Sequence, residues 1–492
     1  MTQRTRLLVQ RWVRLGPRFL PFADAASPDL PLSRLLRLAL FQVSVGMALV
    51  LLVGTLNRVM IVELGVPASL VAVMVSLPVL YAPLRALIGF KSDNHRSALG
   101  WRRVPFIWMG TLLQFGGLAI MPFALLVLSG GGDAGRWPAW IGQLGAGLAF
   151  LLVGAGLHTV QTAGLALATD LAPRETRPRV VGLMYVMLLA GSVASAFAFG
   201  AFLREFTPGR LVQVIQAAAL ATMVLNVLAL WKQEARHPPR RSANVPAAAG
   251  GARAAEPESF GQAWRAFAAG AGVRPRLVVI ALGTLAFGMQ DVLLEPYGGQ
   301  VLGLGVGATT WLTAALACGG LVGFSVASAV LGRGADPLHM AAAGAIAGVP
   351  AFVAVLAGGA AQSTWLFAAG VFTIGLGGGL FGHGTLTATM NSAPPDQAGL
   401  ALGAWGAVQA TSAGVGVAAG GVLRDLAQAA TADGRLGSAL AGPAAGYATV
   451  YVIEIALLLA TLVVLARIIR PAAASAAAAP GRAGAHLSAR PR

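Results

Sequence analysis

The sequence predicts an all-α integral membrane protein with twelve transmembrane helices in two pseudo-symmetric halves of six. Three observations lead to this fold class. The 492 residues are 57% hydrophobic and only 11% charged, with a mean hydropathy of +0.73, whereas a soluble domain carries about 25% charged residues. Apolar runs long enough to cross a bilayer recur along the chain. A long polar stretch separates the sixth run from the seventh.

The apolar runs number twelve, and each reaches the length of about 20 residues that a helix needs to cross the hydrocarbon. Helices are expected because backbone groups in lipid must be hydrogen-bonded within their own segment. The runs cover residues 36–60, 67–90, 103–128, 138–169, 178–203, 210–231, 276–298, 308–332, 338–358, 363–391, 397–423 and 445–468.

The remaining segments complete the domain organisation. Residues 1–32 alternate arginines with large apolar residues, which is typical of an interfacial amphipathic helix or of a partly ordered tail. They lack the apolar core and cleavage site of a signal peptide. The two six-helix halves are predicted at 33–231 and 276–468, joined by a flexible linker at 232–275 that is rich in Pro, Ala, Gly and Arg. The low-complexity tail 469–492 is expected to be disordered.

The basic residues set the expected orientation. With the N-terminus and every second loop placed in the cytoplasm, those segments hold 28 of the 35 Lys and Arg residues, against five in the opposite loops. The positive-inside rule then puts both termini in the cytoplasm. The net charge of +17 therefore requires no nucleic acid, although contact with anionic lipid is compatible with it.

Local matches between the halves indicate an internal repeat. "GFKSD" from Gly89 follows the second run, and "GRGAD" from Gly332 follows the eighth. "DLAPRETRPRVVGL" and "NSAPPDQAGLALGA" follow the fourth and tenth runs, with Ala-Pro and Gly at the same offsets. A G-x-x-x-D loop followed by basic residues, here "GFKSDNHRSALGWRR", resembles the motif of the major facilitator superfamily. Nearly all of residues 30–470 is similar to the PucC/LhaA branch of this superfamily. Four runs carry the similarity: "LALFQVSVGMALVLLVGTLNRVMIVELGVPA", "PLRALIGFKSDNHRSALGWRRVPFIWMGTLLQFGGLAIMPFALL", "MQDVLLEPYGGQVLG" and "LALGAWGAVQATSAGVG".

This resemblance implies a function that composition and spacing do not supply. The PucC/LhaA proteins are implicated in assembling the core or peripheral light-harvesting complexes of phototrophic bacteria. It implies bacteriochlorophyll as ligand or cargo, antenna polypeptides as partners, and the inner, intracytoplasmic photosynthetic membrane as location. By resemblance to the superfamily, a cytoplasmic gate network would include Gly89, Asp93, Arg96, Arg85, Asp170, Gly332 and Asp336. The alternative for these side chains is ordinary interfacial charge.

Charged residues inside the first and seventh runs raise a second hypothesis. Aligning "NRVMIVELG" with "QDVLLEPYG" places Arg58 opposite Asp291. In this superfamily these two helices line the central cavity, so we expect an ion pair between the halves near the periplasmic face, with Glu295 as a second partner. The alternatives are that Arg58 snorkels to the interface and that both carboxylates mark a helix end. Glu295-Pro296 is expected to terminate the seventh span.

Candidate pigment ligands come from residues inside the apolar runs. Bacteriochlorophyll magnesium takes an axial ligand, commonly a His nitrogen. His158 and His383 are the two histidines well inside runs, in the fourth and tenth. Packing through a hydrogen bond is the alternative role for each. Amide, carboxylate or water ligands stay open, and the amide candidates are Gln42, Gln114, Gln161 and Gln409. No direct metal site is expected, because Cys318 is the single cysteine and no metal-ligand spacing occurs.

Other features limit the function. Glu454 lies near the middle of the last run, where a charge costs roughly 2.5–3.5 kcal/mol or more, and its partner cannot be named from the sequence. Glycines from Gly319 and from Gly416 predict close helix packing or lipid contact. No HExxH, Walker A or GxSxG motif occurs, and two formal G-x-G-x-x-G matches are chance because neither follows a strand, so no enzyme is expected. Three interpretations remain: a bacteriochlorophyll-delivering assembly factor, a proton-coupled small-solute transporter that uses Asp291, Glu295 or Asp170, and a pigment-free membrane chaperone.

Overall fold

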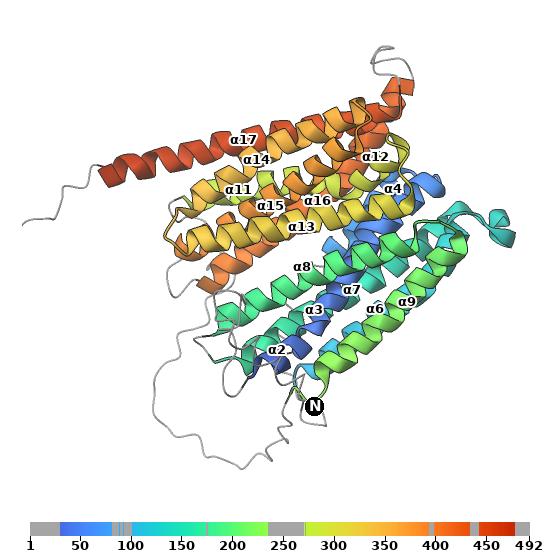
Figure 1. The fold of residues 1–492 in the computed structure, drawn as a ribbon, viewed down its shortest axis with the longest axis horizontal. Coiled ribbons are helices and arrows are strands. Elements are labelled where there is room, and N and C mark those ends of the chain that lie inside the picture. The colour runs from blue at the N-terminus through green and yellow to red at the C-terminus, as the bar shows by residue number, and fades with distance from the viewer. Residues whose placement is uncertain are drawn as a thin grey trace, which may run out of the picture.

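The fold was obtained as a computed structural model, which describes residues 30–80, 88, 92, 101–173, 176–234, 270, 272–392, 398–432 and 442–477. Every element of regular structure in these ranges is helical (Figure 1). Eleven helices are long and apolar enough to cross a membrane, and the described part of a twelfth, Ala68–Val79, is shorter. The predicted all-α membrane fold with twelve helices is confirmed. The amphipathic segment, most of the linker and most of the tail lie outside the described residues, so the domain boundaries stay predictions.

The N-terminal half contains six spans, which Figure 1 colours from blue to light green. The first span is built from α2 (Leu32–Leu38), α3 (Leu40–Leu49), η2 (Val50–Leu56) and η3 (Val59–Glu63). The others are α4 (Ala68–Leu80), α6 (Val104–Leu128), α7 (Ala139–Leu171), α8 (Arg177–Phe202) and α9 (Pro208–Leu230), with the short η4 (Gly132–Arg136) between α6 and α7.

The C-terminal half repeats this arrangement. Its first span consists of α11 (Val273–Gly288), η5 (Met289–Val292) and α12 (Leu294–Gln300). The other five are α13 (Val306–Leu331), α14 (Pro337–Ala360), α15 (Thr364–Ser392), α16 (Ala398–Ala432) and α17 (Ala444–Ala477). Prolines at the start of α9 and α14 fit the first helical turn, where a backbone N–H has no partner within the helix.

Small residues let neighbouring helices approach closely, as expected for helices that pack in lipid. A Cβ on Gly319 would overlap the Phe372 carbonyl on α15, and one on Gly416 would lie 3.1 Å from the Leu285 carbonyl on α11. The predicted close packing at both glycine segments is therefore confirmed.

The first span of each half departs from α geometry where the two spans meet. In the N-terminal half, η2 and η3 are π-helical, and in the C-terminal half η5 is a 3₁₀ turn between two α-helices. Segment η2 contacts η5, and η3 contacts α12. Such irregular turns are frequent at functional sites.

The two halves meet at one end of the molecule and diverge toward the other (Figure 1). We call the end with the connections 64–67, 203–207 and 301–305 the closed end. We call the opposite end the basic end, because Arg34, Arg102, Arg103, Lys232, Arg274, Arg276 and Arg333 lie there. Helix pairs α4–α16 and α8–α13 join the halves. Each polar contact between the halves whose two partners are described lies at the closed end.

Candidate functional site

The seam between the first and seventh spans is the candidate functional site. Here Thr55 Oγ1 lies 3.3 Å from Thr310 Oγ1, and Asn57 Nδ2 donates to the Asp291 carbonyl oxygen at 3.4 Å. Both side chains from the first span are fully buried. These bonds join the two halves inside the hydrocarbon, where an unsatisfied polar group is costly.

Arg58 pairs with Glu63, so the predicted ion pair with Asp291 is wrong. Arg58 Nη1 forms its ion pair with Glu63 Oε1, and its Nη2 donates to the Leu304 carbonyl at 3.1 Å. Among the described residues, no ion pair joins Arg58 to Asp291. The π-helical turn explains the difference, because it brings residues five apart onto one face. The Arg58 side chain is 4% exposed, so it does not snorkel to the interface either.

Arg58 nevertheless connects the halves. Its acceptor, the Leu304 carbonyl, belongs to the connection between α12 and α13 in the other half. Its guanidinium also packs against Gly299, where an added Cβ would lie 3.2 Å from Nε. Arg58 therefore contacts the second half through backbone groups of that half, at Leu304 and Gly299.

Glu295, the predicted secondary partner, is the seventh-span carboxylate that faces the N-terminal half. It accepts a hydrogen bond from Thr313 Oγ1. A Cβ on Gly54 of η2 would lie only 2.6 Å from Glu295 Oε1, so the glycine makes room for this carboxylate. Glu295 is 3% exposed, and its Oε2 has no hydrogen-bond partner in the described part of the chain.

Asp291 and Glu295 lie at a break within the seventh span. Asp291 is in η5, where Gln290 Nε2 donates to its Oδ1. Glu295 is in the first turn of α12, which continues to Gln300. The expected termination at Glu295-Pro296 is therefore wrong, since a proline is tolerated in a first helical turn. Both carboxylates do lie next to helix ends, Asp291 just after α11 and Glu295 in the first turn of α12, but these ends are inside the span.

Glu454 on α17 lies beside the same break. It is fully buried, next to the Gln290 backbone and the Asp291 carboxylate, and α17 contacts η5. Neither carboxylate oxygen has a well-formed hydrogen bond within the described ranges. Among the described residues, the break in the seventh span therefore brings together three carboxylates, those of Asp291, Glu295 and Glu454, and the last two are nearly or fully buried.

Residues that the sequence analysis did not select extend this site toward the closed end. Gln300 Oε1 accepts hydrogen bonds from Arg424 Nη2 and from the Tyr447 hydroxyl, each at 2.8 Å. The Arg424 guanidinium lies 4.7 Å from the Tyr447 ring centroid. Asp425 accepts from the Ser69 backbone N–H at 2.7 Å and so links α16 to α4. The sequence signal was an Arg-Asp pair just past the apolar run 397–423, in a helix that continues beyond it.

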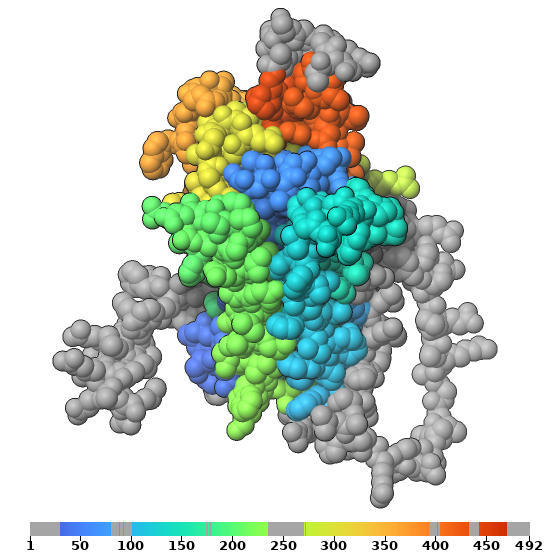
Figure 2. Space-filling view, turned by 90° about the vertical axis from the view of Figure 1, so that its right-hand side faces the viewer, coloured from blue at the N-terminus to red at the C-terminus, as the bar shows by residue number. Residues whose placement is uncertain are grey.

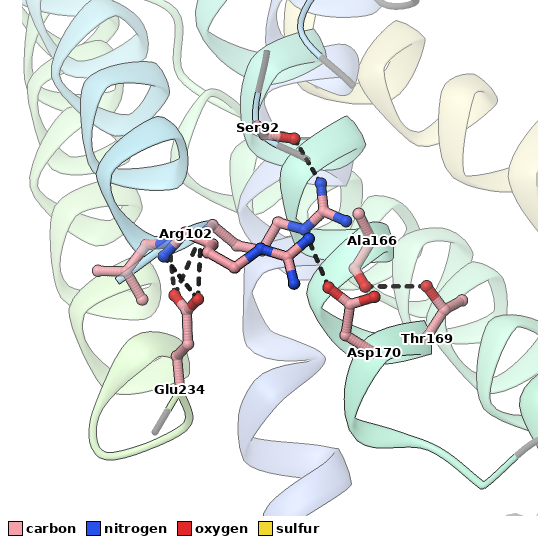
Figure 3. Close-up of polar contacts among 8 residues, drawn as sticks. Ser92, Arg102, Ala166, Thr169, Asp170 and Glu234 are labelled. Atoms are coloured by element: carbon pink, nitrogen blue, oxygen red, sulfur yellow. Dashed lines mark hydrogen bonds and ion pairs between the residues drawn. The ribbon is translucent and has the colours of Figure 1, made fainter. Parts of the chain in front are cut away.

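A second polar cluster lies at the basic end (Figure 3). Arg103 is an ion-pair partner of Asp170, with Nε and Oδ2 3.0 Å apart, and its Nη1 donates to Ser92 Oγ at 2.6 Å. Ser92 belongs to the "GFKSD" segment, so Arg103 links Asp170 to this motif. The Glu234 carboxylate accepts from the backbone N–H groups of Arg102, Arg103 and Val104 and thereby caps α6.

The equivalent helix of the other half, α14, is capped by Asp336. Its Oδ1 accepts from the backbone N–H groups of Leu338 at 2.7 Å and His339 at 3.0 Å. Partial burial opposes ionisation, but these hydrogen bonds and the His339 imidazole outweigh it and lower the pKa of Asp336. Gly332 follows the end of α13, while Arg85, Gly89, Asp93 and Arg96 lie outside the described residues. The gate role stays a prediction.

The pigment-ligand candidates lie on separate helices and show no common site. His158 on α7 and His383 on α15 are both half-buried. The His383 ring lies 4.3 Å from the Phe324 ring centroid, and its Nδ1 has no hydrogen-bond partner among the residues described. No group of three or more His, Cys, Asp or Glu residues in the described ranges could hold a metal ion.

The glutamine candidates differ in their surroundings. Gln42 is fully buried, and neither atom of its amide has a hydrogen-bond partner in the described chain. Gln114 donates to the Ser44 carbonyl at 3.1 Å, within a buried network that joins α3, α6 and α9. Gln161 is buried on α7, and Gln409 is half-buried on α16. Gln114 thus has a structural role already.

Twelve apolar helices in two halves, joined at one end by a buried polar seam, define a polytopic membrane protein of the major facilitator fold. The POT family transporter PepTSo has a similar structure, with a TM-score of 0.62 and 12% identity over 89% of this chain and 98% of that one. A bacterial homologue of the iron transporter ferroportin in an inward-facing state gives a TM-score of 0.61 at 14% identity, covering 88% and 97%.

Sequence comparison then defines the family. The family described as "PUCC protein" matches residues 55–473. The chain is 63% identical to "Protein PucC" of Rhodovulum sulfidophilum, over 86% of this chain and 92% of that protein. It is 56% identical to "Protein PucC" of Cereibacter sphaeroides, over 95% and 99%. A "Bacteriochlorophyll synthase 44.5 kDa chain" of Rhodobacter capsulatus is 28% identical over 80% and 87%. The chain belongs to the PucC family.

Proposed function

We propose that this protein is a membrane assembly factor for light-harvesting antenna complexes, which binds bacteriochlorophyll and delivers it to antenna polypeptides. The observation that carries the proposal is the membership in the PucC family over most of the chain. The name of a more distant relative, which refers to bacteriochlorophyll, supports the choice of cargo. The proposed location is the bacterial inner photosynthetic membrane, and no catalytic step is included.

The distribution of polar groups supports an apolar cargo. The buried carboxylates of the described spans gather at the closed seam, whereas pairs such as α13–α15 and α14–α15 meet through glycine. His383 is the preferred candidate for an axial ligand to magnesium, since its Nδ1 has no hydrogen-bond partner within the described ranges and its ring lies 4.3 Å from the Phe324 ring centroid. His158 stays a second candidate.

The pigment part of the proposal is tested by the absorption spectrum of the protein purified in mild detergent. A near-infrared bacteriochlorophyll band at a fixed ratio to protein is expected. His383→Leu, alone or with His158→Leu, should reduce this band without loss of folded protein. His339→Leu is the matched control, because that side chain is exposed at the basic end. A preparation that folds but never contains pigment favours a pigment-free chaperone.

The assembly part is tested in a phototrophic strain that lacks the gene. The membranes should lose the absorption of the core or the peripheral antenna, and the band that is lost identifies the client. Wild-type complementation should restore it. Unchanged antenna absorption would contradict an assembly role, whatever the result of the pigment measurement.

The proposed orientation places both termini and the basic end in the cytoplasm, following the distribution of Lys and Arg. The closed end then faces the periplasm. Protease added to sealed inside-out vesicles should cut the linker between the halves. Cleavage confined to right-side-out cells would reverse the orientation.

A proton-coupled transporter of small solutes is the second candidate. It is favoured by the buried carboxylates at the break in the seventh span and by the fold shared with transporters, since broken helices hold substrate and ion sites in many carriers. Proteoliposomes distinguish the candidates: substrate-dependent proton uptake that is lost in Glu295→Gln would support transport, and its absence would favour the assembly factor.

A further inference from the structure

A pocket of about 720 Å³ lies at the basic end of the N-terminal half, away from the seam. Its volume is within the range of small-molecule sites, about 300–1,000 Å³. Helices α6 and α9, whose outer surfaces lie side by side in Figure 2, form its walls together with the start of the first span. The lining residues are Arg34, Trp101, Val104, Trp108, Val227, Leu230, Trp231, Lys232, Gln233 and Glu234.

The floor of this pocket is a turn held from two sides. Arg34 donates to Gln233 Oε1 at 3.0 Å and to the Gln233 carbonyl at 2.7 Å, and Gln233 is nearly fully buried. On the other side, Glu234 caps the start of α6. Between these anchors, Lys232 has a left-handed backbone with φ of 54°, which is uncommon for a residue other than glycine. The two anchors hold Trp231 and Lys232 at the pocket.

The charges at the pocket favour an anionic ligand. Arg34 and Lys232 contribute two cations, and Lys232 has no hydrogen-bond or ion-pair partner among the described residues. The single carboxylate, that of Glu234, is already used by three backbone N–H groups of α6.

The tryptophans place the ligand at the membrane surface. Trp108 and Trp231 are 41% and 59% exposed, and Trp101 lines the pocket with them. Tryptophan is enriched where the hydrocarbon meets the polar headgroups. Indole walls beside apolar Val104, Val227 and Leu230 suit the upper part of an acyl chain, and the cations suit a phosphate.

We propose that this pocket binds an anionic phospholipid, with the phosphate at Arg34 and Lys232 and the glycerol and upper chains between the three tryptophans. Basic pockets between transmembrane helices bind such headgroups in other membrane proteins. The lipid would brace the turn 231–234, where the N-terminal half leads into the linker. This inference does not depend on pigment binding.

The test uses the full-length protein in detergent and phospholipids whose chains carry bromine, which quenches nearby tryptophan fluorescence. Brominated phosphatidylglycerol should quench at lower concentration than brominated phosphatidylcholine. Lys232→Gln should weaken binding of the anionic lipid about fivefold, because one basic residue near the membrane surface is worth about that factor. Trp231→Leu should remove part of the quenching. Equal affinity for the two lipids would overturn the proposal.

Arg333→Gln is the matched control, since this exposed cation lies at the basic end of the other half and outside the pocket. It should leave the affinity for phosphatidylglycerol unchanged. An effect equal to that of Lys232→Gln would show that the lipid is attracted by the general surface charge and not by this pocket. Soluble glycerol phosphate is the second control. Competition at the same concentration as phosphatidylglycerol would assign the pocket to a free phosphate and not to a lipid. Each variant is first checked for a single peak in size-exclusion chromatography.

Discussion

Arg58, which is buried, forms an ion pair with the half-exposed Glu63 across the π-helical turn η3 at the seam between the halves. The same guanidinium reaches the Leu304 carbonyl of the C-terminal half. One cation thus neutralises a carboxylate of its own helix and also holds the neighbouring half. The seam therefore depends on Arg58 more than on the Asp291 carboxylate, which accepts its hydrogen bond from the adjacent Gln290.

Arg58→Gln should lower the free energy of unfolding by about 1–3 kcal/mol, because the Leu304 carbonyl loses its donor from the other half and the Glu63 carboxylate loses its partner. Glu63→Gln should cost more, about 3–5 kcal/mol, because the charge that it leaves unpaired is the Arg58 guanidinium, whose side chain is only 4% exposed. The double variant should be less destabilised than the sum, because the residues are coupled. Thermal unfolding in detergent measures the stability of the three variants relative to the wild type. Glu205→Gln, which breaks an exposed pair with Arg210, is the control and should cost about 0–1 kcal/mol. A cost for Arg58→Gln as small as the control would contradict this role.

Gly54→Ala should destabilise the closed end by about 1–3 kcal/mol, the usual cost of overpacking. The new Cβ would lie 2.6 Å from Glu295 Oε1 and 2.7 Å from Thr313 Oγ1, in a contact between the halves where Glu295 is 3% exposed. The same thermal unfolding measurement applies. Gly116→Ala is the control on α6, since no atom lies within 4 Å of its added Cβ. A Gly54→Ala protein as stable as the control would show that Glu295 is free to move away.

Asp336 gives a pH dependence with a defined sign. Hydrogen bonds to the α14 start lower its pKa in the folded protein below the unfolded value of about 3.9. Its contribution is therefore complete above that unfolded value and is lost as the pH falls through the lower folded pKa. Asp336→Asn keeps a capping side chain and should remove this contribution to the acid-dependent loss of stability. Unfolding midpoints measured between pH 3 and 7 test it, and identical pH profiles would contradict the assignment.

The spans, the two halves and the glycine contacts could be predicted from the sequence, because the length of the apolar runs and the positions of small residues determine these features directly. The contacts at the seam could not be predicted. Pairing of Arg58 with Glu63 requires a π-helical turn, and an α-helical spacing of three or four residues does not suggest it. The Gln300–Arg424–Tyr447 cluster was missed because α16 continues beyond its apolar run. At the basic end, the motif pointed to Asp170, but its partner Arg103 came only from the fold.

The last prediction concerns Glu454, whose partner the sequence could not supply. The structure places it against the break in the seventh span, beside Gln290 and Asp291, with neither oxygen well hydrogen-bonded in the described part of the protein. A buried polar group in this condition costs about 1–3 kcal/mol. Glu454→Met, which keeps a similar volume, should therefore raise the unfolding midpoint in detergent. Glu295→Met should lower it, because Thr313 would lose its acceptor. If Glu454→Met is instead strongly destabilising, the carboxylate has a bound partner at this break. The next measurement would then compare proton or cation binding by the purified wild type with that by Glu454→Gln.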